Sequence, residues 1–417
     1  MPTVEEFTEK AEAWLEANAR LRTPDDAEPE FVWGQGSFAV PVFHNLGFDE
    51  EQAHLRALQA WQQKKATEGY HAIAWDERFG GLGLTRAHAR AFGRLERNYV
   101  VPDSHELFSV TVGLIATTIR EWGTEEQQND WIPGLLRTDD LSCQLFSEPG
   151  AGSDLASLGC KAERDGDEWR ITGQKVWTSG AQFSATGLLL ARSELDAPKH
   201  KGITAFIIPF DIPGVEVRQI RQASGGTSFN EVFFDNAIVP DSCRLGPEGA
   251  GWKVALTTLG FERDHSASGG SGAASGGNWE KLLATAQAFD RVDDPIVRDD
   301  LTRMYTFLTV QRLLNRRAAD LARSGTPGPE GSLGKLMWTE GMTMMSGVVS
   351  RILGPRLIAD SGEWGSYEWG EHVLGAPGYR IAGGSDEIQR NIIGERVLGL
   401  PGEPRVDKNT PWRDLPR

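Results

Sequence analysis

Two glycine-containing segments carry groups suited to holding a flat, charged ligand. In LFSEPGAGSDLASL (145–158), Gly150 and Gly152 let backbone N–H groups approach an anion closely, and nearby side chains supply polar oxygens. About twenty residues later, GQKVWTSGA (173–181) sets a tryptophan beside two hydroxyls, so an indole could stack on a flat ring while the hydroxyls bond its polar edge. Taken alone, the first segment could be a tight turn and Trp177 a core residue. No βαβ pattern with a downstream acid follows, so this is not a Rossmann fingerprint.

The elements that must position these segments change in type along the chain. The first third has helical periodicity, with a capping box at Thr3 and Glu6 and a second N-cap signal at Asp49 and Gln52. From about residue 142 to 245 the pattern becomes β-rich, and KAERDGDEWRITG has the Asp-Gly turn of a hairpin. Helical periodicity then returns. SASGGSGAASGG (266–277) is either a linker or a small-residue helix face.

This order predicts three domains within one α+β chain. The expected boundaries are a helical domain at 1–138, a β domain at 139–247, a helical domain at 248–400 and a polar tail at 401–417.

Composition narrows the classes of function. The 417 residues allow a sizeable core, and no apolar run is long enough to cross a bilayer. A net charge of −16 disfavours nucleic acid and anionic membranes as partners. The acidic start lacks the features of a targeting peptide, so the cytoplasm is the expected location. Cys143, Cys160 and Cys243 lack metal-ligand spacing, and their odd number argues against a disulfide framework.

In this order and spacing, the two glycine-containing segments resemble the flavin site of the acyl-CoA dehydrogenases. The likeness runs from WDERFGG to GERVLGLP, and YRIAGGSDEIQRNIIGERVLGLP (379–401) is similar to the closing active-site segment of that family. It implies an N-terminal all-α domain, a middle β-barrel-like domain and a C-terminal four-helix bundle that oligomerises. It also implies FAD as cofactor, with the flavin carrying the redox chemistry.

The resemblance implies a role for individual residues. Ser147 and Ser179 align with residues that hydrogen-bond the flavin ring, Trp177 with the aromatic that flanks it, and Leu145 and Phe146 with residues along its face. Further cofactor contacts are implied at Gly152, Arg291, Ser385 and Glu387, and contacts to the acyl-CoA at Ser153, Arg263 and Gly384.

The catalytic base of the family often stands where this chain has Gly383, which carries no side chain. Glycine keeps the backbone N–H that, in the family, helps to polarise the thioester oxygen. In a subset of the family the base comes from the helix after the β domain, and Glu262 in FERD aligns with that position. The resemblance therefore predicts that Glu262 takes the α proton while the β hydrogen leaves as hydride to FAD. The alternatives are a surface Glu262 paired with Arg263 or Lys253, and Asp386 or Glu387 as rival bases.

A second departure concerns the adenylate end of FAD. The family uses an arginine followed by Phe-Gly to reach the diphosphate across a dimer, whereas this chain reads FDRVDDP. Arg291 is retained, but Asp293 and Asp294 would repel a diphosphate. We therefore expect either a homo-oligomer or, because this clamp is weakened, an α2β2 assembly in which a different chain supplies it.

The predicted function is oxidation of an acyl-CoA to the trans-2-enoyl-CoA, with an electron-transferring flavoprotein as acceptor. Basic residues at KHKG (199–202) or Arg263 could steer the polyanionic substrate. The glycine at 383 leaves room beside the α carbon, which favours branched, long or polycyclic acyl groups. The alternatives are an acyl-CoA oxidase of the same fold and a non-catalytic subunit that completes the FAD site of a partner.

Overall fold

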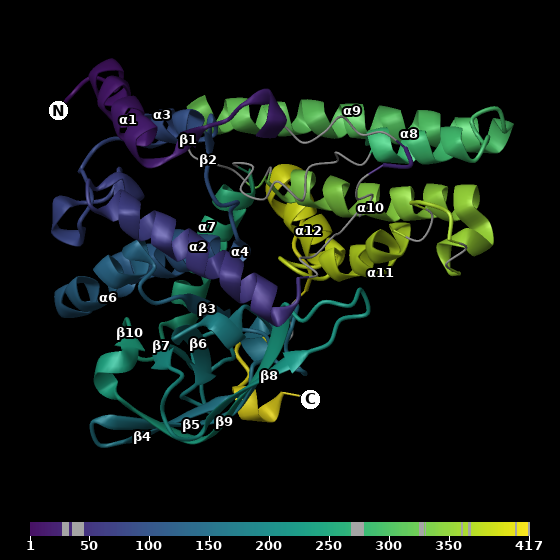
Figure 1. The fold of residues 1–417 in the computed structure, drawn as a ribbon. Helices are drawn as coiled ribbons and strands as arrows, with labels where there is room; N and C mark the ends of the chain where they lie inside the picture. Colours follow the sequence, from purple (N-terminus) through teal and green to yellow (C-terminus); the bar gives the residue numbers. More distant parts are fainter. Residues whose placement is uncertain are drawn as a thin grey trace.

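The structure is a computed structural model with helices before and after an eight-stranded sheet along the chain, and with a separate two-stranded sheet of β1 (Arg20–Leu21) and β2 (Tyr99–Val100). In Figure 1 the N-terminal helices lie on the left, the strands of the larger sheet at the bottom and the long C-terminal helices at the upper right. Residues 262–267 and 322–324 are described by their backbone alone. The described residues are 1–26, 33–35, 46–267, 279–324, 329, 331–359, 362–365, 368–404 and 407–415.

Local capping decides where the N-terminal helices begin. Helix α1 (Val4–Asn18) starts at the predicted capping box, in which Glu6 N donates to Thr3 Oγ1 (3.2 Å) and Thr3 N to Glu6 Oε2 (2.9 Å). The predicted cap at Asp49 is wrong, because the N-cap of α2 (Phe48–Ala66) is Gly47 and Asp49 lies in the first turn, where its charge suits the helix dipole. The remaining helices here are α3 (Arg86–Glu96), α4 (Glu106–Phe108), α5 (Ala116–Trp122) and α6 (Glu125–Arg137).

The middle of the chain forms the predicted sheet, with strands in the order β10-β7-β6-β4-β5-β9-β8 and β3 parallel to β6. The predicted hairpin is β4 against β5, and its turn contains Gly166 in the left-handed region (φ 64°). The strands are β3 (Ser142–Leu145), β4 (Lys161–Asp165), β5 (Glu168–Ser179), β6 (Thr186–Arg192), β7 (Ile203–Pro209), β8 (Val215–Ile220), β9 (Phe229–Pro240) and β10 (Arg244–Leu245).

The helices between residues 279 and 379 pack around an apolar core of their own, whereas Val254 and Ala255 of the preceding helix belong to the core that the N-terminal helices share with the sheet. The largest fully buried side chain in the core of residues 279–379 is Trp369, whose Nε1 donates to Thr285 Oγ1 at 2.9 Å. The helices are α7 (Gly251–Ala267), α8 (Trp279–Ala288), α9 (Pro295–Ser324), α10 (Gly331–Leu353), α11 (Trp369–Tyr379) and α12 (Asp386–Ile392). The expected α+β architecture is confirmed. Residues 268–277 of the glycine- and serine-rich segment lie outside the described part, so neither interpretation of it is tested. In the part of the chain that is described, no helix combines the length and apolarity needed to cross a membrane.

The end of the chain returns to the sheet, where the C-terminus lies in Figure 1. Trp412 is only 6% exposed, its Nε1 donates to the carbonyl oxygen of Ser157 (3.2 Å), and the Arg192 guanidinium lies 4.9 Å from its ring centroid. Lys199 lies 3.0 Å from both Asp407 and Asp154, so the tail is tied to the glycine-containing loop. Lys199 is therefore already neutralised by two carboxylates and is poorly placed to steer a polyanion.

Trp412→Ala is expected to lower the free energy of unfolding by about 3 kcal/mol, because it removes a large buried ring and leaves a cavity. Chemical denaturation followed by far-UV circular dichroism measures this loss. Arg413→Ala is the matched control, since its exposed ion pair with Asp196 should contribute within about 0.5 kcal/mol. Similar losses in the two variants would contradict a specific role for the indole.

Candidate active site

The loop that follows β3 is anchored by a buried ion pair. Glu148 accepts hydrogen bonds from Gly159 N (2.7 Å), Cys160 N (2.9 Å) and Lys175 Nζ (2.7 Å). Lys175 is fully buried and also donates to the carbonyl oxygen of Phe146 at 3.0 Å. Both ends of the 147–158 loop are therefore tied to β5. The sequence analysis did not identify this pair, because its partners are 27 residues apart.

The glycines of this loop are not required by the packing of the chain itself. A Cβ atom built on Gly150 or Gly152 would meet no other atom within 4 Å. Leu145 and Phe146 have buried side chains (0% and 5% exposed), which leaves only their backbone for a ligand. This fits the predicted close approach of a ligand to the loop backbone.

Trp177 is held in a strained conformation with its ring in solvent. Its φ of 62° lies in the left-handed region, which non-glycine residues seldom adopt, and its side chain is 60% exposed. The pairing of β5 with β9 shifts register just there. Val176 N donates to the carbonyl oxygen of Ser147 at 2.9 Å, and β5 ends at Ser179. The bond from Val176 therefore holds Ser147 against the strand that carries Trp177 and Ser179, and such backbone strain is common at functional positions.

The closing segment meets this loop through two serines. Ser153 Oγ lies 3.3 Å from Ser385 Oγ, although the residues are 232 positions apart. Gly383 and Gly384 both have positive φ (64° and 86°), and Ser385 caps helix α12. Glu387 is exposed in the first turn of that helix.

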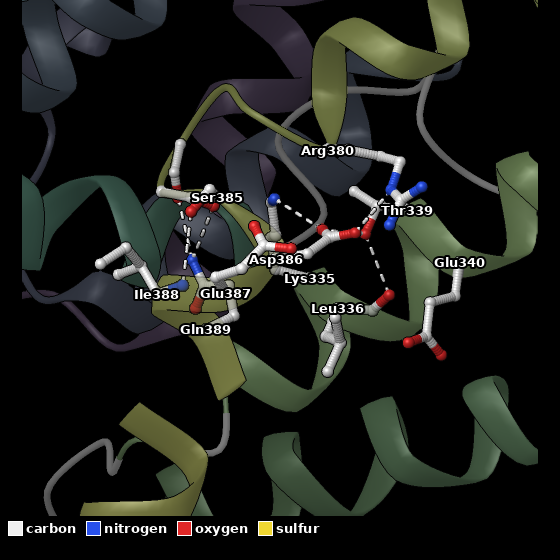
Figure 2. Close-up of polar contacts among 12 residues, drawn as sticks. Lys335, Leu336, Thr339, Glu340, Arg380, Ser385, Asp386, Glu387, Ile388 and Gln389 are labelled. Atoms are coloured by element: carbon white, nitrogen blue, oxygen red, sulfur yellow. Dashed lines mark hydrogen bonds and ion pairs between the residues drawn. The ribbon is translucent and has the colours of Figure 1, made fainter. Parts of the chain in front are cut away.

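Asp386 does not fit the role of a base. Figure 2 shows its carboxylate between Arg380 and α10: Arg380 Nε donates to Oδ2 and Thr339 Oγ1 to Oδ1, both at 2.7 Å. Burial opposes ionisation of Asp386, but the hydrogen bonds from Arg380 and Thr339 prevail and keep its pKa below the ordinary value. A carboxylate with a lowered pKa and occupied oxygens is a weak base. This rival to Glu262 is therefore disfavoured.

Glu262 and Arg263 lie on helix α7, but their side chains are outside the described part of the structure. The preceding residue, Phe261, packs against the core cluster that contains Phe146. The backbone that carries Glu262 therefore follows directly on a residue packed into the core that the N-terminal helices share with the sheet.

Arg291 is engaged within its own chain. Its Nη2 lies 2.9 Å from Asp294 Oδ2, and its buried Nε has no hydrogen-bond partner among the described residues. Asp294 also accepts from the backbone of Ile296 (2.9 Å) and so caps helix α9.

A carboxylate that the sequence analysis missed lies next to Ser179. Glu106, at the start of α4, accepts a hydrogen bond from the Ser179 side chain. It is accessible to solvent, yet the surrounding protein weakens its solvation and, together with the charge of Glu51, raises its pKa. Burial, with a contribution from the Glu106 charge, also raises the pKa of Tyr379. No sequence signal marked Glu106, because the contact joins α4 to the end of β5, which are far apart in the sequence.

Together these groups fit the predicted flavin. An exposed indole with a left-handed backbone lies on the strand that ends at Ser179, and Ser153 of the glycine-containing loop contacts Ser385, the N-cap of α12. The donors are indole, hydroxyl and backbone groups. Within the described ranges, no group of three or more His, Cys, Asp or Glu residues could hold a metal ion.

Comparisons with known proteins give one consistent family. The models named "Acyl-CoA dehydrogenase, N-terminal domain", "middle domain" and "C-terminal domain" match residues 44–139, 143–237 and 249–398. Acyl-CoA dehydrogenase IpdE1 of Mycobacterium tuberculosis is 36% identical over 97% of this chain and 100% of that protein. The solved structure of the Tcur3481-Tcur3483 steroid ACAD is 26% identical and covers 96% of this chain and 98% of its own, with a TM-score of 0.69. The ChsE4-ChsE5 complex of M. tuberculosis is 25% identical and covers 97% and 99%, with a TM-score of 0.66.

Proposed function

Because the chain belongs to the acyl-CoA dehydrogenase family and uses FAD, we propose that it oxidises an acyl-CoA thioester to the trans-2-enoyl-CoA. The observation that carries this proposal is the contact of Ser153 with Ser385 at 3.3 Å. It joins Ser153, which the resemblance assigns to the acyl-CoA, to Ser385, which the resemblance assigns to the cofactor. The site-residue assignments and the domain boundaries given above remain proposals.

The proposed chemistry divides between the chain and its cofactor. Glu262 takes the α proton of the acyl group, and its position on α7, the helix that follows the β domain, supports this role. A carboxylate that is desolvated by bound substrate is a stronger base. The N–H of Gly383 stabilises the negative charge that builds on the thioester oxygen. FAD supplies the acceptor for the β hydrogen, which leaves as hydride, and an electron-transferring flavoprotein then takes the electrons.

The acyl group is proposed to be bulky and polycyclic. Gly383 has no side chain where many relatives carry one, which leaves space beside the α carbon. One structural neighbour is described as a steroid ACAD, and the match with this chain covers 98% of that neighbour. A polycyclic acyl-CoA should therefore be a better substrate than a straight-chain one.

The assembly is proposed to be α2β2, with a homo-oligomer as the alternative. Arg291 is paired with Asp294 rather than held free for a diphosphate across an interface. Helix α9 also exposes Ile296, Val310 and Leu313 (59%, 43% and 58% exposed), which lie along one side of the helix and suit a subunit contact. Two structural neighbours are described by paired names, Tcur3481-Tcur3483 and ChsE4-ChsE5.

Anaerobic flavin bleaching tests the function. The chain, purified with and without candidate partner chains, is mixed with a series of acyl-CoA thioesters while the flavin absorbance is recorded. Bleaching by one class of thioester is expected. Bleaching with none of them would favour the non-catalytic subunit, and oxygen consumption without an added acceptor would favour an oxidase.

Glu106→Gln is expected to shift substrate preference. An apolar acyl group next to Ser179 would desolvate the Glu106 carboxylate, whereas glutamine avoids burying a charge. The kcat/KM for apolar straight-chain thioesters should rise about tenfold relative to that for hydroxylated ones. Glu121→Gln, which removes an exposed charge in the same domain, is the control. An equal change for every thioester would show that Glu106 does not select among acyl groups.

A further inference from the structure

The segment from Arg380 to Asp386 is closed by both the backbone and the side chain of its last residue. Asp386 N donates to the carbonyl oxygen of Arg380 at 2.9 Å. Arg380 Nε donates in return to Asp386 Oδ2 at 2.7 Å. Arg380 and Asp386 are therefore joined by two hydrogen bonds, and Ile381 to Ser385 form the loop between them.

The same carboxylate fastens this loop to α10. Asp386 is 1% exposed, and its Oδ1 accepts from Thr339 Oγ1 (2.7 Å) and lies 3.5 Å from Lys335 Nζ, one helical turn away (Figure 2). Two cationic groups and a hydroxyl surround one buried carboxylate. An amide in its place would keep one acceptor oxygen but leave the cationic groups without their counter-charge, which is costly in a buried place.

A second buried side chain fixes the peptide groups inside the loop. Gln389, one turn along α12 and 4% exposed, donates from Nε2 to the carbonyl oxygens of Gly383 (3.0 Å) and Gly384 (3.3 Å). A Cβ on Gly384 would lie 2.8 Å from that Nε2, and the φ of 86° further excludes side chains. The backbone at Gly383 is thus held from inside the protein while Gly383 itself remains exposed.

We propose that Asp386 is a positioning residue that sets the direction of the Gly383 N–H toward the thioester oxygen of the substrate. This inference rests on the proposed function, because only in that function does the Gly383 N–H stabilise charge on the thioester oxygen. The Asp386 carboxylate does not touch the reacting atoms. It acts through the loop, by clamping Arg380 and the start of α12 to α10. A misdirected donor weakens transition-state stabilisation but leaves substrate binding largely intact.

Asp386→Asn keeps the shape of the side chain and removes the charge that attracts Arg380 and Lys335. We expect kcat to fall about 10- to 100-fold with little change in KM, and FAD content to be retained. Glu340→Gln is the matched control, because it removes a carboxylate that links α10 to α12 through an exposed pair with Arg390 at 2.8 Å. The control should keep wild-type kcat.

Hydrogen exchange gives a readout that needs no turnover. In Asp386→Asn without added substrate, the amides of residues 381–385 should exchange about tenfold faster, and in Glu340→Gln at the wild-type rate. If Asp386→Asn does not fold, Thr339→Val replaces it, and Thr339→Ser should rescue both readouts by restoring the hydroxyl donor. Unchanged exchange in the 381–385 loop together with unchanged kcat would overturn the inference. If wild type bleaches with no thioester, the proposed function fails, and hydrogen exchange still decides whether Asp386 positions the loop.

Discussion

Glu262→Gln is expected to slow flavin reduction by acyl-CoA about 10²- to 10⁴-fold, which is the usual loss when a general base is removed. Glutamine has nearly the same shape but cannot accept the α proton at neutral pH. FAD should remain bound, because the groups proposed to hold it lie on β5, the 147–158 loop and the closing segment. Stopped-flow absorbance with the best thioester from the bleaching series measures the rate, and the absorbance ratio of flavin to protein measures FAD content.

The control separates loss of the base from loss of charge. Glu248→Gln removes an exposed carboxylate just before α7, where it pairs with Arg164 at 3.3 Å, and should react at the wild-type rate. Persistent reduction in Glu262→Gln would exclude Glu262 as the base. Glu106 would then become the first rival, because it is an accessible carboxylate with a raised pKa beside Ser179.

Local patterns predicted the elements well, because neighbouring residues decide them. The capping box at Thr3 and Glu6 and the β4–β5 hairpin at Gly166 appear as expected. The error at Asp49 has the same local origin: the N-cap is Gly47, a residue without a capping side chain that stands two positions before Asp49. Residues that could cap a helix and residues that favour its first turn have similar chemistry, so the sequence alone separates them poorly.

The site was only partly predictable, because several of its supports join distant parts of the chain. The resemblance indicated Ser147, Trp177 and Ser179; in the structure Trp177 and Ser179 lie on β5, and Ser147 is hydrogen-bonded to that strand through Val176. Nothing in the sequence indicated the left-handed backbone of Trp177 or the contact of Glu106 with Ser179.

Buried charges and the end of the chain were harder still to predict. In the sequence Glu148 and Lys175 cannot be told from ordinary surface charges, because their ion pair is formed only in the folded chain. The tail looked polar throughout, yet Trp412 is buried against the sheet. Both depend on tertiary partners and not on local spacing.

The chain purified alone is expected to hold little FAD, and a preparation with its partner about one FAD for every two chains. In the proposed site a diphosphate would have to be bound near Arg291, but that guanidinium already pairs with Asp294, and Asp293 adds a further negative charge. Repulsion between carboxylates and a diphosphate weakens binding at this end. Native mass spectrometry gives the subunit composition, and the flavin absorbance of the same sample gives the FAD content.

Asp294→Asn tests directly whether the charge of Asp294 and its pairing with Arg291 weaken FAD binding. Asparagine can still cap α9 through its side-chain oxygen, as Asp294 does for Ile296 N, but it no longer forms an ion pair with Arg291. The chain alone should then bind FAD about tenfold more tightly, since one repulsive charge is removed and the arginine is released. Asp299→Asn, which breaks an exposed pair with Arg303 on the same helix, should leave FAD binding unchanged. One FAD per chain in a homo-oligomer of wild type would rule out the shared site, because a complete clamp would then exist without any second chain.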